Sequence, residues 1–146
     1  MEFLTCIVAA EEDEYPALAA AGSPLHEWSG VEVPGFDTLK LATLHSLLMD
    51  ESLQAALDLY EPVCVAEGDN ETLVLRVDAE LFEKLVELDE ESLESVATEL
   101  AATEAYEDEA LDAEDIQDQL ISLVELAQLA ESQDQVLFVW IKLLQR

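Results

Sequence analysis

The sequence predicts an α+β fold, in which a small mixed or antiparallel sheet of four or five strands packs against several helices. Two apolar runs rich in β-branched and aromatic residues open and close the chain, at residues 3–10 and 135–143. Segments with helical spacing of leucines lie between them, so we expect helices packed on the sheet. A run that is apolar without alternation is typical of a strand covered on both faces. We therefore expect the two terminal strands to be central and adjacent, and residues 1–146 to form a single domain.

The first half of the chain alternates short elements with turn-forming residues. In chain order we expect a strand at 3–10, a solvated charge run at 11–14, a helix at 15–21, a short edge strand at 31–33, a helix at 38–49 capped by Asp37, and a helix at 51–60. In the helix at 38–49, Leu41, Leu44 and Leu48 share one face. Leu39 and Leu47 lie off that face, which indicates a helix that is buried on more than one side.

The second half of the chain begins with a hairpin and ends with a long helix and a strand. In chain order we expect strands at 62–66 and 72–77, helices at 79–88 and 90–103, an acidic connector at 104–111, a helix at 113–131 and the closing strand. Asp78, Asp89 and Asp112 directly precede the three helices, where a carboxylate caps the first free backbone amides.

Acidic residues outnumber basic ones by 35 to 5, for a formal charge of −30, whereas small domains ordinarily carry about 2–8 charges. The charge is −10 over residues 1–60, −11 over 61–100 and −9 over 101–146, so it is not confined to a tail. Nucleic acids need clustered Lys and Arg and anionic membranes repel acidic surfaces, so we expect neither as a direct partner. Three interpretations remain open: salt or solubility adaptation of the host, a surface for a basic protein partner, and mimicry of a nucleic acid.

The sequence indicates a cytoplasmic protein. Residues 1–5 lack the basic region that opens a secretory signal. The longest apolar run, residues 136–144, contains Lys142 and is too short to cross a bilayer. Cys6 and Cys64 lie in apolar strand-like runs without a C-x-x-C pattern, so we expect reduced, buried thiols. The sequence alone does not show whether the two cysteines are neighbours.

The sequence contains no motif that indicates catalysis, a metal or a cofactor. The four glycines form no phosphate-binding loop, and no G-x-S-x-G elbow is present. The acidic runs lack the alternating ligand spacing of a calcium loop. We therefore expect no catalytic residue, no metal site and no cofactor.

Residues that break the folding pattern are the candidates for a functional site. Lys40 and His45 lie on the mostly apolar helix at 38–49, where they either find internal partners or line a ligand pocket. Aromatic and charged residues outside the regular elements either pack onto the core or anchor a protein contact. The candidates of this second kind are His26, Trp28, Tyr106, Glu107 and Asp108.

Several short motifs give the chain a resemblance to a known group. The helix reads FDTLKLATLHSLL at residues 36–48, VDAEL follows at 77–81, and a long helix leads into the closing strand VLFVW at 136–140. In this order the motifs resemble those of the YfbM-like group of uncharacterised bacterial proteins, over residues 36–141. The N-terminal region departs from the group, and the segment before the long helix has only Tyr106 where the group has several aromatic residues. The resemblance implies a single α+β domain and no activity or site residue.

These observations favour a non-catalytic protein that acts through protein–protein contact, with a basic partner of the kind that an immunity or inhibitor protein binds. The alternative is a small-ligand-binding protein or enzyme with a pocket near His45 and Lys40. A further alternative is that the acidity carries no functional message and reflects only salt adaptation. The oligomeric state is left open by the sequence.

Overall fold

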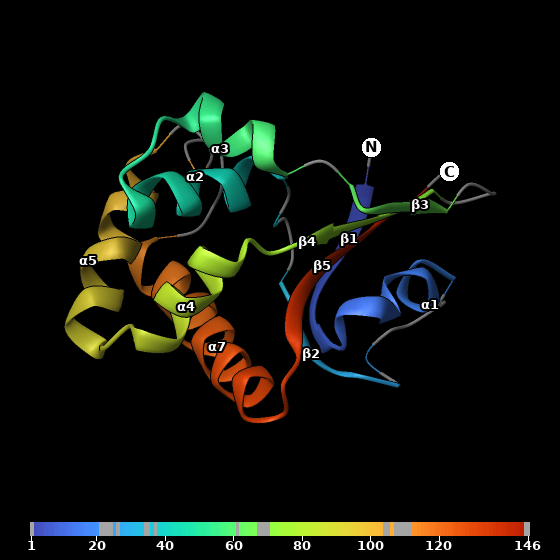
Figure 1. The fold of residues 1–146 in the computed structure, drawn as a ribbon. Helices are drawn as coiled ribbons and strands as arrows, with labels where there is room; N and C mark the ends of the chain where they lie inside the picture. Colours follow the sequence, from blue (N-terminus) through green and yellow to red (C-terminus); the bar gives the residue numbers. More distant parts are fainter. Residues whose placement is uncertain are drawn as a thin grey trace.

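The fold is described by a computed structural model that covers residues 2–20, 25, 27–33, 36, 38–60, 62–66, 71–103, 106 and 112–144 (Figure 1). Its strands are β1 (Glu2–Ala10), β2 (Ser29–Glu32), β3 (Cys64–Ala66), β4 (Thr72–Arg76) and β5 (Val136–Leu144). Its helices are η1 (Glu12–Glu14), α1 (Tyr15–Ala20), α2 (Thr38–Met49), α3 (Leu53–Leu59), α4 (Ala79–Glu87), α5 (Glu90–Ala101) and α7 (Ala113–Ser132). The predicted α+β class is confirmed.

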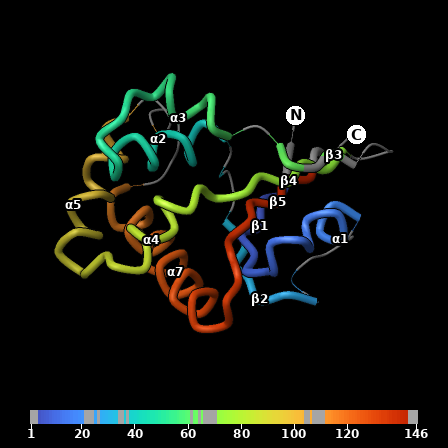
Figure 2. The backbone as a smooth tube through the Cα atoms, in the orientation of Figure 1, coloured from blue at the N-terminus to red at the C-terminus, as the bar shows by residue number. Residues whose placement is uncertain are grey.

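The strands form one antiparallel sheet in the order β2-β1-β5-β4-β3. The terminal strands β1 and β5 are central and adjacent, as predicted, and they pair along their whole length from Glu2↔Leu144 to Ala10↔Val136. The start of β1 therefore lies beside the end of β5, at the same end of the sheet (Figure 2). The two edges are formed by the shortest strands, β2 and β3.

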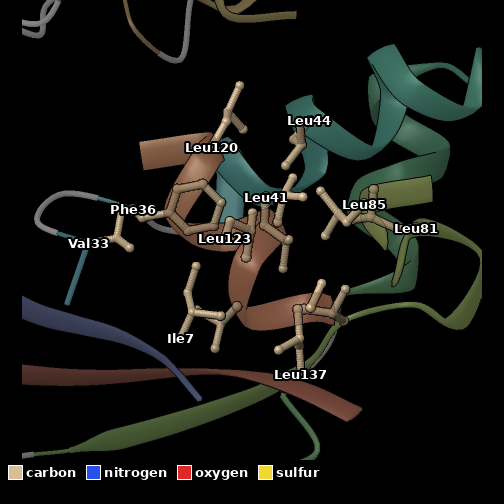
Figure 3. Close-up of a cluster of buried hydrophobic side chains, with 14 of the residues drawn as sticks. Ile7, Val33, Phe36, Leu41, Leu44, Leu81, Leu85, Leu120, Leu123 and Leu137 are labelled. Carbon is tan, nitrogen blue, oxygen red and sulfur yellow. The ribbon is translucent and has the colours of Figure 1, made fainter. Parts of the chain in front are cut away.

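Both faces of the sheet are covered, because the side chains of the central strands alternate between two cores. On β5, Leu137, Val139 and Ile141 join the larger core beneath α2, α4, α5 and α7. Figure 3 shows Ile7 and Leu137 of the sheet facing leucines from α2, α4 and α7. Phe138 and Trp140 point the other way, into a smaller core covered by α1.

The indole of Trp140 attaches α1 to the second face of the sheet. Trp140 is fully buried, and its Nε1–H donates a buried hydrogen bond to the carbonyl oxygen of Leu18, at 3.0 Å. Because burial of an indole N–H without a partner is costly, this bond determines where α1 lies on β5. A short helix is thereby held in place over the central strand.

Most predicted elements are found, with small changes at their ends. The helix at 38–49 is α2 without any shift, and the predicted caps Asp78, Asp89 and Asp112 each accept an amide hydrogen bond at the start of a helix. Hydrogen bonds from Ser92 hold the pKa of Asp89 below its usual value. The predicted caps and turns at Asp37 and at 67–70 lie outside the described residues.

Three of the differences from the predicted bounds concern the charge run at 11–14, the strand β2 and the start of helix α3. The charge run at 11–14 contains the helix η1, because Glu11 and Glu14 cap each other's backbone amides. The edge strand expected at 31–33 is found as β2 at Ser29–Glu32. Val33, just beyond the end of β2, still donates its N–H to the Thr5 carbonyl of β1. Helix α3 begins at Leu53 because Ser52 is its N-cap.

The sheet register separates the two cysteines. Cys6 is paired with Trp140, Trp140 with Val74, and Val74 with Cys64, so three strand spacings lie between the cysteines. At about 4.8 Å per spacing, their Cα atoms are roughly 14 Å apart, which is too far for a disulfide. Cys6 is a free, buried thiol, and burial together with Glu32 raises its pKa to about 11.

Candidate functional site: a groove along the open edge of strand β2

Lys40 on α2 is buried, although it is one of only five basic residues in the chain. Its Nζ lies 5.4 Å from the centroid of the Tyr106 ring, within the range of a cation–π contact. Tyr106 is itself buried, so its ring packs against the lysine and is not offered to a partner. The predicted contact residues His26, Glu107 and Asp108 lie outside the described residues.

His45 is also buried and is held by groups from outside its own helix. Its Nδ1 lies 2.9 Å from Oη of Tyr60, and the two rings meet edge to face with centroids 5.5 Å apart. The same Oη accepts a hydrogen bond of 3.4 Å from the N–H of Asp78. The other ring nitrogen, Nε2, lies 3.4 Å from Oε2 of Glu51, but the two atoms are out of hydrogen-bonding alignment.

A reversal of the chain after α2 brings Glu51 back to His45. Asp50 has a φ of 55°, in the left-handed region, which ends α2 and turns the chain toward α3. Glu51 lies beyond the end of α2, so the helical spacing of residues 38–49 gives no sign of its contact with His45. Burial raises the pKa of Tyr60 well above its usual value, with Asp78 and Glu51 contributing, so the phenol stays neutral.

Lys40 and His45 do not converge on one pocket. They are five positions apart, which places them about 140° apart around the helix. A cavity of about 280 Å³ lies beyond Tyr60, where Val63, Arg76 and Asp78 contribute to its walls. Neither Lys40 nor His45 lines it, since both lie deeper in the helical layer. Within the described residues, their partners are those of packed interior groups.

Trp28 is the predicted contact residue that reaches the surface. Its side chain is half-buried, and its Nε1–H donates a hydrogen bond of 2.9 Å to Oε2 of Glu14. Glu14 also accepts from the backbone N–H of Glu11, so the helix η1 holds the carboxylate that orients the indole. One edge of the indole is thereby fixed while its remaining surface is left accessible.

Trp28 lines an open groove of about 440 Å³ that runs along the edge strand β2. Residues from both layers around the sheet form it; those that matter most are Leu25, Trp28, Gly30, Glu125, Leu126 and Leu129. Leu25 and Leu129 are exposed by 36% and 38%, although both are large apolar side chains. Exposed apolar side chains that gather in one groove are typical of a binding surface.

The groove lies on both sides of the sheet edge, which its glycine makes possible. A Cβ on Gly30 would lie 2.8 Å from Cδ2 of Leu25 and 2.6 Å from the carbonyl oxygen of Ile7. Because Gly30 is paired with Val8 of the smaller core, Leu25 lies on the α1 side of the edge. Leu126 belongs to the larger core, so α7 forms the opposite wall.

The charge at the groove has one sign among the described residues. Glu125 lines the groove, and the exposed residues Glu27 and Glu32 flank Trp28 and β2. Four of the five basic residues lie in the described part of the chain, and none of them lines this groove. Lys40 is buried, and Arg76 is paired with Glu12 at 2.6 Å, as expected for a scarce cation in an acidic protein.

Leu25, Glu125 and Leu129 were not identified from the sequence. The sequence does carry a signal for the long helix: Leu129 is apolar but lies off the helix face formed by Ile116, Leu120, Leu123, Val124, Ala127 and Ala130. The described residues contain no cluster of three or more metal-ligating side chains. The helices in the same ranges are also too short or too polar for a membrane span.

The comparisons with known proteins identify one similar structure. No protein-family model and no curated protein matches the chain. The crystal structure of YfbM from Escherichia coli, a protein of unknown function, is similar over 97% of this chain and 99% of that one. The identity is 13% and the TM-score 0.46. YfbM is the namesake of the group that the sequence motifs resemble, and no activity or residue role comes with the likeness.

Proposed function

We propose that this protein is a non-catalytic cytoplasmic binding protein that acts by contact with a basic protein, as immunity and inhibitor proteins do. The observation that carries the proposal is the groove along β2, where exposed leucines and an oriented tryptophan are surrounded by carboxylates. A tryptophan held by a hydrogen bond loses little freedom on binding, which suits it to anchor a contact.

Charge complementarity selects a basic occupant for this groove. A protein of net charge −30 repels a second copy of itself and any acidic protein, but attracts cations from a distance. Such attraction raises association rates by roughly 10- to 1,000-fold at low salt. The leucines and Trp28 then supply the short-range contact, because charges at the rim of an interface contribute mainly to the association rate and to specificity.

The proposal is tested with a synthetic peptide that alternates lysine and valine, and with a control peptide in which glutamate replaces lysine. Binding is measured by isothermal titration calorimetry and by shifts of amide resonances in isotopically labelled protein. We expect the lysine peptide to bind with shifts at β2 and α7, and the glutamate peptide not to bind. Affinity that falls steeply with salt is expected, since the surrounding carboxylates are solvent-exposed.

Two matched pairs of variants separate the groove from the general acidity. Leu129→Ala removes a groove leucine, and Leu53→Ala removes one of equal exposure, 38%, from the first turn of α3. We expect Leu129→Ala to weaken binding about five- to tenfold, as for an interface anchor, and Leu53→Ala to leave it unchanged. Glu125→Lys likewise weakens binding more than Glu99→Lys, whose site is an exposed turn of α5. Equal effects within each pair would show that the peptide binds the acidic surface at large and would refute the proposal.

A further inference from the structure

We infer that the basic partner binds as an extended segment that adds a strand to the open edge of β2, an inference that rests on the proposed function. Within the described residues, β2 has a partner strand on one side only. An edge strand presents unpaired backbone N–H and C=O groups, and peptides that bind in this way obtain their affinity from main-chain hydrogen bonds.

The register identifies the backbone groups that face the open edge. Val33 donates its N–H to the Thr5 carbonyl, and the same alternation makes Val31 and Ser29 point their backbone groups toward β1. Gly30 and Glu32 are the alternate residues, which lie opposite Val8 and Cys6 in pairs that exchange no backbone hydrogen bonds. Their N–H and C=O groups therefore point away from β1, into the groove.

The two walls of the groove suit the alternating side chains of an added strand. Side chains on one side of such a strand meet Leu25 and Trp28, and those on the other meet Leu126 and Leu129 of α7. Successive residues of a strand point to opposite faces, so apolar side chains can contact either wall while basic ones reach the carboxylates of Glu32 and Glu125. The absence of a Cβ at Gly30 lets Leu25 close over the edge from the α1 side.

The acidity explains why the open edge of β2 is available to a basic partner and does not pair with the same edge of a second copy. Soluble proteins protect open edges with proline, with charged side chains, or by covering them. Here β2 reads Ser-Gly-Val-Glu, and two copies brought edge to edge would each carry a charge of −30. Repulsion therefore disfavours a second copy of the chain, whereas a basic strand is attracted.

Amide hydrogen exchange tests the inference on the unmodified protein, with the alternating lysine and valine peptide as the probe. With the peptide at about 100 times its dissociation constant, exchange at the amides of Gly30 and Glu32 should slow by roughly 100-fold. The amide of Val31 is the internal control, because it already points toward β1 and should change far less. Two further peptides carry N-methyl groups on one or the other set of alternate amides. The peptide whose methylated amides face β2 should bind at least about tenfold more weakly than the other.

A variant pair examines the same edge from the side of the protein. Glu32→Pro removes an outward-facing N–H, which an edge strand tolerates, and we expect it to weaken binding about tenfold relative to Glu32→Ala. The Ala variant removes the same charge, and exchange at Val31 reports whether the Pro variant keeps β2 paired. Peptide binding that depends on Leu129 but leaves Gly30 and Glu32 unprotected would overturn strand addition while the proposed function stands. Binding that does not depend on the groove residues would overturn both.

Discussion

Removal of one hydroxyl group, by Tyr60→Phe, should destabilise the fold without leaving a cavity. Within the described residues, the hydroxyl is the hydrogen-bond partner of His45 Nδ1, at 2.9 Å, and it also accepts the N–H of Asp78. His45 is 1% exposed and Tyr60 3%, so water cannot readily replace the lost oxygen. A buried polar group left without a partner costs about 1–3 kcal/mol, and we expect a loss in this range.

The loss is measured as a shift of the urea unfolding midpoint, followed by circular dichroism. With a slope of about 2 kcal/mol per molar urea, the midpoint should fall by roughly 0.5–1.5 M. Tyr15→Phe is the matched control, since Tyr15 is 36% exposed on α1 and its change should stay within about 0.5 kcal/mol. A Tyr60→Phe midpoint indistinguishable from that of the control would refute the hydrogen-bonded chain from Asp78 through Tyr60 to His45.

Alkaline pH provides an independent check on the same residue. Burial raises the pKa of Tyr60 above its ordinary value of 10.0, so the phenol ionises first in the unfolded chain. Its stabilising contribution is therefore complete below about pH 10 and is lost as the pH rises above that value. The stability difference between the wild type and Tyr60→Phe should shrink above pH 10, whereas a difference that is constant with pH would contradict the burial of an un-ionised phenol.

Two further predictions concern the buried thiol and the net charge. In a Cys64→Ser variant, the Cys6 thiol should react with iodoacetamide at pH 8 at least about 100-fold more slowly than a free cysteine. The reason is that a pKa of about 11 in place of 9.0 leaves roughly 100-fold less thiolate. A reaction rate equal to that of the unfolded chain would contradict the burial of Cys6. The urea unfolding midpoint should rise as the NaCl concentration is raised from low salt to about 1 M. At about 1 M the Debye length is only about 3 Å, so the salt screens the self-repulsion of 30 net charges. A midpoint that does not depend on salt would show that local pairing already offsets the repulsion.

The fold was predictable where a pattern of side chains repeats within one segment. Helix α2 was found at its predicted bounds because leucines at helical spacing run through it. The centrality of β1 and β5 followed from runs that are apolar on both faces, which a strand at the edge of a sheet does not need. The short strand β2 begins two residues and ends one residue before the predicted strand, because its position depends on pairing with β1 more than on its own side chains.

The candidate site was predictable only in part, through Trp28. An aromatic residue in a loop is visible in the sequence, but the Glu14 carboxylate that orients it lies 14 positions away. Leu129 could be noted as apolar and off the helical stripe, yet nothing in its own segment places it beside β2. Lys40 and His45 stood out as polar residues on an apolar helix, and the structure gives them buried partners, Tyr106 and Tyr60.

The class of fold, the order of its elements and the even spread of acidic residues could all be read from the amino-acid sequence. Periodicity decides which face of a segment is buried, and composition decides net charge; both are local sums along the chain. Three features became visible only once the chain was folded: the contact of His45 with Glu51 and Tyr60, the two strands that lie between the cysteines, and the open edge of β2 between leucines of two layers. These depend on contacts such as that between Trp140 and Leu18, 122 positions apart, which arise from packing and leave no periodic signal in either segment.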